Sequence, residues 1–188
     1  MRAIVGSIEA EYRRYKALGE GALSQLGNDE LTAAGSGGGN SIAIICWHLV
    51  GNLRSRFTDF LTSDGEKPWR RREEEFQSRT VTRAELLSYW ESGWGVLLQT
   101  LAGLSDAHLA QTVVIRGRPL LVHEALHRSL AHVAYHVGQV VYAARGLRGD
   151  AWRFLSIPPG QSDAYNAQPA FEKPQAHAAE LRRPDRPT

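Results

Sequence analysis

Four segments of the chain repeat apolar residues at intervals of three and four, and this helical spacing constrains the fold more than any other feature. The segments cover approximately residues 3–26, 41–62, 82–104 and 122–145. Each is long enough for about six helical turns and has one apolar face, which must be buried against another element. Little strand-like sequence lies between them, so the pattern predicts an all-α fold in which four helices form a bundle.

The boundaries of these segments carry residues that are typical of helix ends. Asn40 or Ser41 is expected to cap the second segment, and Thr82 with Glu85 forms the capping-box pattern at the start of the third. Gly146 is expected to stop the fourth helix. These signals indicate separate helices joined by loops.

Two of the connections differ from ordinary short loops. Residues 63–81 are polar and long enough for a crossover connection between the second and third helices. The β-branched residues 112–115, followed by the turn-like sequence 116–119, predict a short extended excursion before the last helix. We assign residues 1–166 to the helical domain and expect the polar, proline-containing residues 167–188 to form a flexible tail.

Composition excludes several classes of function. A formal net charge of +2 over 188 residues gives no reason to expect a nucleic-acid partner. No apolar run reaches the length that spans a membrane, and the N-terminus lacks the pattern of a signal peptide. Cys46 is the only cysteine, so no internal disulfide can form and a reducing compartment is suitable. We therefore expect a cytoplasmic protein that binds neither nucleic acid nor a membrane.

Two further features have simple structural interpretations. Cys46 lies in the apolar run 42–47, which predicts a buried, unreactive thiol rather than a nucleophile. Arg70–Arg72 is followed at once by Glu73–Glu75, and this balance of charge predicts a solvated turn. The favoured interpretation of each feature is therefore structural.

Two pairs of histidines, each spaced by four residues, lie in the last helical segment. His123 pairs with His127, and His132 pairs with His136. Residues four apart project from the same helix face, so either pair offers two ligands to a transition metal. The two pairs face directions that differ by roughly 140–180°, so one metal ion cannot use both.

The first pair matches the His-Glu-x-x-His pattern of zinc proteases through His123, Glu124 and His127. That pattern is short, and the residues after His127 do not extend it to the three-histidine form. The pair also lies at the start of the helix, where ends fray. We therefore expect surface histidines here, and a zinc protease is the least favoured alternative.

The second pair lies in the middle of the helix, beside its apolar stripe. His48 of the second helix offers a third imidazole, with Asn52 one turn further along the same face. Three histidines from two helices would leave coordination positions open, as catalytic metal sites do. His48, His132 and His136 are therefore the candidate metal ligands, and Asn52 and Ser129 are candidates for supporting or substrate contacts. The alternative is that the histidines are structural and bind backbone carbonyls; no catalytic residue is assigned.

The sequence around these histidines resembles the DinB/YfiT-like superfamily. The likeness rests on residues 47–53 and on residues 132–139. The runs 54–69 and 156–162 resemble a subgroup of that superfamily that lacks an assigned function. The resemblance extends from residue 1 to about residue 167.

The resemblance implies a four-helix bundle, often a homodimer, with a three-histidine divalent-metal site that His48, His132 and His136 fill here. Histidine ligation suits nickel, zinc, manganese and iron and does not choose among them. Some relatives transfer bacillithiol or mycothiol, so the resemblance implies a metal-dependent transferase that activates a small thiol for attack on an electrophile.

Arginines could hold the carboxylates of such a thiol. The candidates are Arg54, Arg56 and the cluster Arg70–Arg72, although solvated arginines are the simpler interpretation. Two other functions use the same histidines. One is a non-catalytic metal- or ligand-binding, stress-related dimeric scaffold, and the other is a metal-dependent hydrolase with water as the nucleophile.

Overall fold

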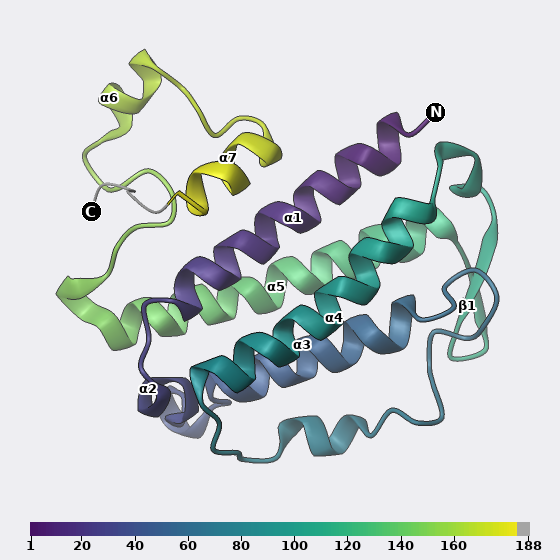
Figure 1. Cartoon of the computed structure of the whole chain (residues 1–188), viewed down its shortest axis with the longest axis horizontal. Coiled ribbons are helices and arrows are strands. Elements are labelled where there is room, and N and C mark those ends of the chain that lie inside the picture. The colour runs from purple at the N-terminus through teal and green to yellow at the C-terminus, as the bar shows by residue number, and fades with distance from the viewer. Residues whose placement is uncertain (184–188) are drawn as a thin grey trace.

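The computed structural model describes residues 1–183 and is dominated by helices (Figure 1). The α-helices are α1 (Ala3–Leu23), α2 (Asn28–Thr32), α3 (Ile42–Phe57), α4 (Arg83–Gly103), α5 (Val122–Arg148), α6 (Ser162–Ala167) and α7 (Pro174–Leu181). The strands are β1 (Thr112–Ile115) and β2 (Arg118–Leu121), and the 3-10 turns are η1 (Ser36–Gly38), η2 (Arg72–Phe76), η3 (Asp106–His108) and η4 (Gly149–Ala151). The all-α class predicted from the helical spacing is confirmed.

The four long helices of the described chain lie side by side and run along a common direction (Figure 1). Helix α3 packs against both α4 and α5, and α1 packs against both α5 and α4. The C-terminal helix α7 lies on the outer side of α1. The α3–α5 contact brings together the helix that carries His48 and the helix that carries His132 and His136. None of the helices in residues 1–183 combines the length and the apolar character required to cross a lipid bilayer.

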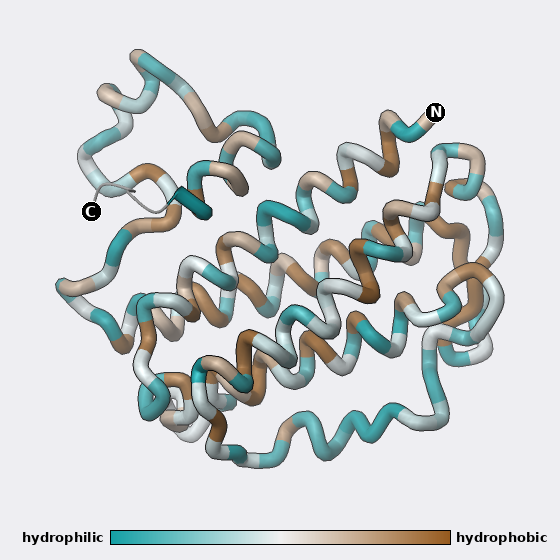
Figure 2. Tube along the Cα trace, viewed as in Figure 1, coloured by the Kyte–Doolittle hydropathy of each residue, from teal (hydrophilic) through white to brown (hydrophobic). Residues whose placement is uncertain are grey.

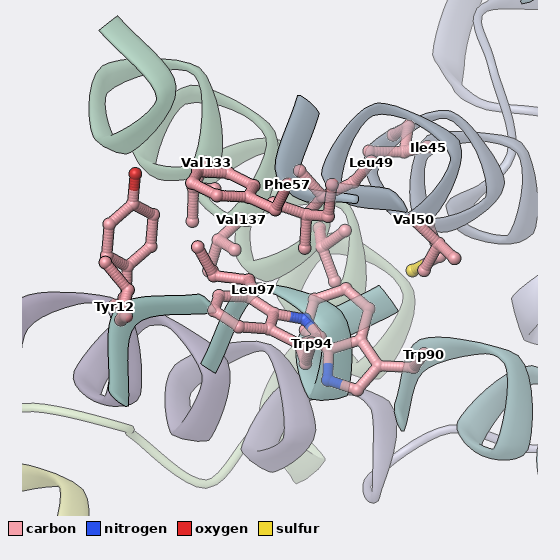
Figure 3. Packing of buried hydrophobic residues seen from close by; sticks show 14 of the residues in the cluster. Tyr12, Ile45, Leu49, Val50, Phe57, Trp90, Trp94, Leu97, Val133 and Val137 are labelled. Atoms are coloured by element: carbon pink, nitrogen blue, oxygen red, sulfur yellow. The ribbon is translucent and has the colours of Figure 1, made fainter. Parts of the chain in front are cut away.

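Large aromatic side chains of α4 fill the centre of the core (Figure 3). Trp90 and Trp94 are fully buried, and their rings lie 5.3 Å apart. Val133 and Val137 approach them from α5, on the same side of that helix as the apolar stripe expected from the sequence. The histidines His132 and His136 therefore lie at the margin of this core.

Gly93 permits the close approach of α4 to α3. A Cβ at this position would lie 3.1 Å from the Cα of Val50 and 3.2 Å from its carbonyl oxygen, and this backbone cannot move aside as a flexible side chain could. We expect Gly93→Ala to lower the free energy of unfolding by about 1–3 kcal/mol, because an inserted methyl must separate two packed helices. Urea denaturation at neutral pH measures the change.

The matched control for this substitution is Gly95→Ala on the same helix. Gly95 is exposed and a Cβ there meets nothing within 4 Å. Alanine favours the helical backbone by up to about 1 kcal/mol over glycine, so this variant is expected to be as stable as the wild type or more stable. Equal destabilisation by the two variants would show that the loss at residue 93 does not arise from helix packing.

The predicted extended excursion before the last helix is confirmed as a β-hairpin. Strands β1 and β2 are antiparallel, and Arg116 and Gly117 turn the chain with positive φ angles of 55° and 68°. The carboxylate of Asp64 accepts hydrogen bonds from the backbone N–H groups of Arg116 and Gly117 at 2.8 and 2.7 Å. The connection after α3 is therefore tied to the hairpin, and Ile115 is held near the end of α3.

Two helix ends differ from the positions predicted by the sequence. Helix α3 ends at Phe57 rather than near residue 62, because Asp59 adopts a left-handed conformation with φ of 48°. Helix α5 continues through Gly146 to Arg148 and ends at Gly149, whose φ is 50°. A glycine stops a helix only where the backbone takes a positive φ, and that residue is Gly149.

The C-terminal segment carries a helix that contacts the rest of the fold. In α7, Ala178 is buried and the Nε2 atom of His177 lies 2.8 Å from the carbonyl oxygen of Leu155. The division of the chain at residue 166 and the flexibility of the segment that follows remain predictions. Residues 184–188, the end of that segment, lie outside the described residues.

The N-terminus of α1 is capped by a side chain from η3. The carboxylate of Asp106 accepts hydrogen bonds from the backbone N–H groups of Ala3, Ile4 and Val5 at 2.8, 3.1 and 3.0 Å. The hydrogen bond from Val5 is the largest of the effects that lower the pKa of this carboxyl group. Asp106 therefore links the start of the chain to the loop that follows α4.

We expect Asp106→Ala to lower the midpoint of thermal unfolding by a few degrees at neutral pH, since three N–H groups lose their acceptor. The pKa is lowered in the folded state, so this stabilisation is present above the unfolded-state pKa of about 3.9 and is lost as pH falls through the folded-state value. The difference between variant and wild type should therefore shrink at acidic pH. Asp150→Ala, an exposed aspartate in η4, is the control, and an equal effect of both variants would contradict the capping role.

Candidate metal centre

Three imidazoles from two helices converge at the contact between α3 and α5. The Nε2 atom of His132 lies 3.3 Å from Nε2 of His48 and 3.1 Å from Nε2 of His136. The potential ligand atoms of all three residues lie within 4.8 Å of one another. His132 and His136 are one helical turn apart on α5, and His48 comes from the facing side of α3. The structure thus brings together the three histidines selected from the sequence.

The tautomers of two of these histidines follow from their other ring nitrogens. Nδ1 of His48 lies 2.9 Å from Oε2 of Glu75, and Nδ1 of His136 lies 2.8 Å from Oε1 of Gln139. A carboxylate and an amide oxygen accept hydrogen bonds, so each Nδ1 carries the proton and donates it. The lone pairs of both imidazoles are then on Nε2, which is the atom directed at His132.

This donor set fits a divalent transition-metal ion. Neutral imidazole nitrogens directed at one another repel unless a cation or a shared proton lies between them. A hydrogen bond from Nδ1 to a carboxylate is also the usual support of a metal-bound histidine, because it fixes the ring and raises the basicity of the ligand nitrogen. The three histidines can therefore hold a metal ion. The donor atoms suit several metals and do not identify one.

Burial keeps the imidazoles of α5 neutral. It lowers the pKa of His132 to about 3, with smaller contributions from the neighbouring His136 and His48. Burial also lowers the pKa of His136, against the opposing effect of its hydrogen bond to Gln139. Both side chains are therefore unprotonated at neutral pH, the form in which histidine binds a metal.

Glu75 links Arg70 to His48 through a buried series of hydrogen bonds. Arg70 donates two hydrogen bonds to its carboxylate, from Nε at 2.8 Å and from Nη2 at 2.9 Å. The side chains of Arg70 and Glu75 are only 2% and 8% exposed. Burial alone would raise the pKa of Glu75, but the hydrogen bonds and charges of His48 and Arg70 outweigh it and hold the pKa below its ordinary value. The carboxylate is therefore ionised beside the histidine.

The prediction that residues 70–75 form a solvated turn is wrong for its two ends. The long connection is mostly hydrophilic (Figure 2), and residues 71–74 are exposed as predicted. Arg70 and Glu75 instead point inward, and the ring of Phe76 lies 4.7 Å from that of His48. The connection thus covers the outer side of His48. Nothing in its charge pattern distinguishes Glu75 from its two glutamate neighbours.

Gly51 makes room for the carboxylate of Glu75. It lies on α3 one turn after His48, and it is buried. A Cβ built at this position would overlap Oε1 of Glu75 and lie 2.7 Å from Cδ. Since Arg70 and His48 hold that carboxylate on its other sides, it has little space to move. The close approach of the connection to α3 therefore depends on the missing side chain.

The other residues selected from the sequence are placed as follows. Asn52 and Ser129 line a pocket of about 220 Å³ that also reaches His132. Arg56 is buried and donates to Glu66 at 3.1 Å, and Arg54 is exposed, with its guanidinium 5.9 Å from the ring of Trp69. None of these four side chains hydrogen-bonds a candidate ligand in the described structure. Gln139, which does, was missed, although it lies one turn after His136.

The first histidine pair does not form a comparable cluster. The rings of His123 and His127 lie 6.2 Å apart, and Nδ1 of His123 lies 3.0 Å from the carbonyl oxygen of Leu109. Within residues 1–183, the group of potential metal ligands formed by His48, His132 and His136 includes neither of them. Cys46 is fully buried, and burial raises the pKa of its thiol. A buried, protonated thiol is a poor nucleophile, as the sequence interpretation required.

One family model matches the chain, over residues 2–161, and its description is "Protein of unknown function (DUF1572)". The matched region contains the three histidines, Glu75 and Gln139. No curated protein and no solved structure matches the chain.

Proposed function

The chain belongs to the DUF1572 family, and we propose that it is a divalent-metal protein that activates a low-molecular-weight thiol for transfer to a small electrophile. One observation carries the proposal: three Nε2 atoms meet, and Glu75 and Gln139 hold the opposite nitrogens of two of the rings. Structural histidines would direct their nitrogens to separate partners instead. We also propose that the four long helices form a DinB/YfiT-like bundle, in line with the resemblance of residues 47–53 and 132–139.

The ligand set supports an open, reactive site. Three protein ligands leave positions for water or substrate, whereas structural sites are closed by four. A divalent ion bound there would lower the pKa of a thiol and hold it as the thiolate. Glu75 would orient His48 and partly neutralise the positive charge of the site, and Arg70 keeps Glu75 ionised. Phe76 shields the imidazole of His48 from solvent.

The transfer proposed here forms a bond between the thiol sulfur and an electrophilic carbon while the bond from that carbon to its leaving group breaks. The thiol proton is released to solvent before the attack, and the electron pair of the broken bond departs with the leaving group. The thiol must be a cosubstrate of the bacillithiol or mycothiol type, because Cys46, the only cysteine of the chain, is fully buried. A homodimer in the cytoplasm remains our expectation for the assembly and the location.

Metal analysis combined with a turnover assay tests this function. The full chain, purified without a tag or chelator, is expected to contain about one nickel, zinc, manganese or iron ion per chain. Addition of bacillithiol and a reactive aryl halide should then give saturable conjugation that ceases in metal-stripped protein. Metal binding with no turnover across a panel of thiols and electrophiles would reject the transferase and leave a metal-binding scaffold. Ester cleavage without added thiol would identify a hydrolase.

A further inference from the structure

We propose that the pocket beside His132 binds the substrate that accepts the thiol, and that this substrate is a small aromatic carboxylate. The role of this substrate as the thiol acceptor rests on the proposed function. Its binding does not, because protein side chains alone form the pocket. The pocket lies between the end of α3, the start of α5 and the β-hairpin. Its walls include Asn52, Phe57, Phe60, Ile115, Ala125 and Arg128.

The size of the pocket limits the ligand to about one ring. Its volume is about 220 Å³. A buried apolar cavity of about 150 Å³ accommodates benzene, so this pocket has room for one aromatic ring and a short substituent. Larger ligands, such as a nucleotide or a peptide, would not fit inside it.

Part of the pocket lining is apolar and packed into the core. Phe57 and Phe60 are 2% and 8% exposed, and their rings lie 5.3 Å apart at an angle of 31°. Ile115 lines the same pocket, and its strand is held by hydrogen bonds between the hairpin and the loop after α3, including a 2.7 Å hydrogen bond from Gly65 N–H to the carbonyl oxygen of Val114. Packed aromatic side chains offer faces and edges that favour an aromatic ring.

Arg128 gives the pocket a positive charge that the protein does not neutralise. In the described chain this exposed guanidinium makes no hydrogen bond or ion pair. Arg56, the other arginine of the pocket, is already bonded to Glu66, Ser55 and the carbonyl oxygen of Gly65. An arginine without a partner beside an apolar pocket is well suited to a carboxylate, which it can bind through two parallel hydrogen bonds.

The position of Arg128 also orients the ligand. Arg128 and His132 are four residues apart on α5 and therefore lie on the same helix face, about 5–6 Å apart at their Cβ atoms. A carboxylate on Arg128 would place the ring against Phe57 and Phe60, with a substituent directed toward His132, the one candidate metal ligand that lines the pocket. The half-buried amide of Asn52, which also makes no hydrogen bond in the described structure, is available to a polar group of the ligand.

Calorimetric titration of the full chain with 3-phenylpropionate and with its neutral amide tests the proposal. The acid is expected to bind at least about tenfold more tightly, because a hydrogen-bonded ion pair with Arg128 has no equivalent in the amide. Arg128→Gln should remove this preference and leave amide binding unchanged. Arg153→Gln, at an exposed arginine that follows η4 and lies outside the pocket, should keep it. Ala125→Leu should abolish binding of both ligands by filling the pocket.

The titrations are made on metal-loaded and metal-stripped protein, and circular dichroism verifies that each variant is folded. Equal affinity for acid and amide in the wild type, or an acid preference that Arg128→Gln leaves intact, would overturn the inference. No binding of either ligand would overturn it as well. If the stripped protein discriminates the two ligands but never takes up metal, the proposed function fails while the pocket assignment stands.

Discussion

Replacing Glu75 by alanine is expected to be the most destructive single substitution outside the core. The change leaves Arg70, whose side chain is 2% exposed, without its partner. Breaking a buried ion pair by removing one member costs about 3–5 kcal/mol, because the remaining charge stays desolvated. It also removes the acceptor of the His48 Nδ1–H group. Urea denaturation of the metal-free protein measures the loss of stability without contribution from a bound ion.

The matched control is Glu74→Ala, at the preceding residue of the same charged run. The Glu74 side chain is 59% exposed, and substitution of such a residue is expected to change the free energy of unfolding by less than about 0.5 kcal/mol. Glu75→Gln retains an acceptor for His48 but loses the charge, and it is expected to weaken metal binding by about 10–100-fold, as changes behind a metal ligand usually do. If Glu75→Ala and Glu74→Ala proved equally stable, the hydrogen bonds that join Arg70, Glu75 and His48 would not stabilise the fold as proposed.

Removal of His132 is expected to have the largest effect on metal binding. Its Nε2 atom lies between those of His48 and His136, at 3.3 and 3.1 Å, so the variant His132→Ala loses the nitrogen common to both contacts. Affinity should fall by more than the roughly 10–100-fold typical of a residue behind the ligands. Competition with a chromophoric chelator measures the affinity, and mass spectrometry of the purified protein measures the metal content.

His127→Ala on the same helix is the control for this experiment. His127 is exposed and lies outside the cluster of potential ligands. The variant should retain the metal content of the wild type. The reverse result, with metal lost from His127→Ala and kept by His132→Ala, would favour the zinc-protease pattern of His123, Glu124 and His127 and would remove the basis of the proposed function.

The sequence predicted the parts of this protein that depend on periodicity. The spacing of apolar residues located the long helices, and the four-residue spacing of His132 and His136 placed both imidazoles on one helix face. His48 was selected because Asn52 follows it by one turn on the same face of α3, and its imidazole does lie beside those of His132 and His136. These predictions succeeded because a helix converts spacing along the chain into direction in space.

The residues that support the site could not be predicted in this way. Glu75 reaches His48 across 27 residues of sequence, from a connection without a regular repeat. Its burial depends on the path of that connection over α3, which no local pattern determines. Gln139 could have been found, because it lies three residues after His136 and such pairs are neighbours on a helix. The pocket beside His132 combines distant segments, so it is visible only in the folded chain.

Gly51 has a consequence for how variants of this protein should be judged. Any side chain at this position would displace the carboxylate of Glu75, and with it the proton acceptor of His48. A variant such as Gly51→Val would keep every histidine and every acidic residue of the site and still lose the hydrogen bond that supports the candidate ligand His48. The integrity of the centre is thus encoded partly in a residue that contributes no functional group, and a search for intact ligand motifs would count such a defective chain as functional.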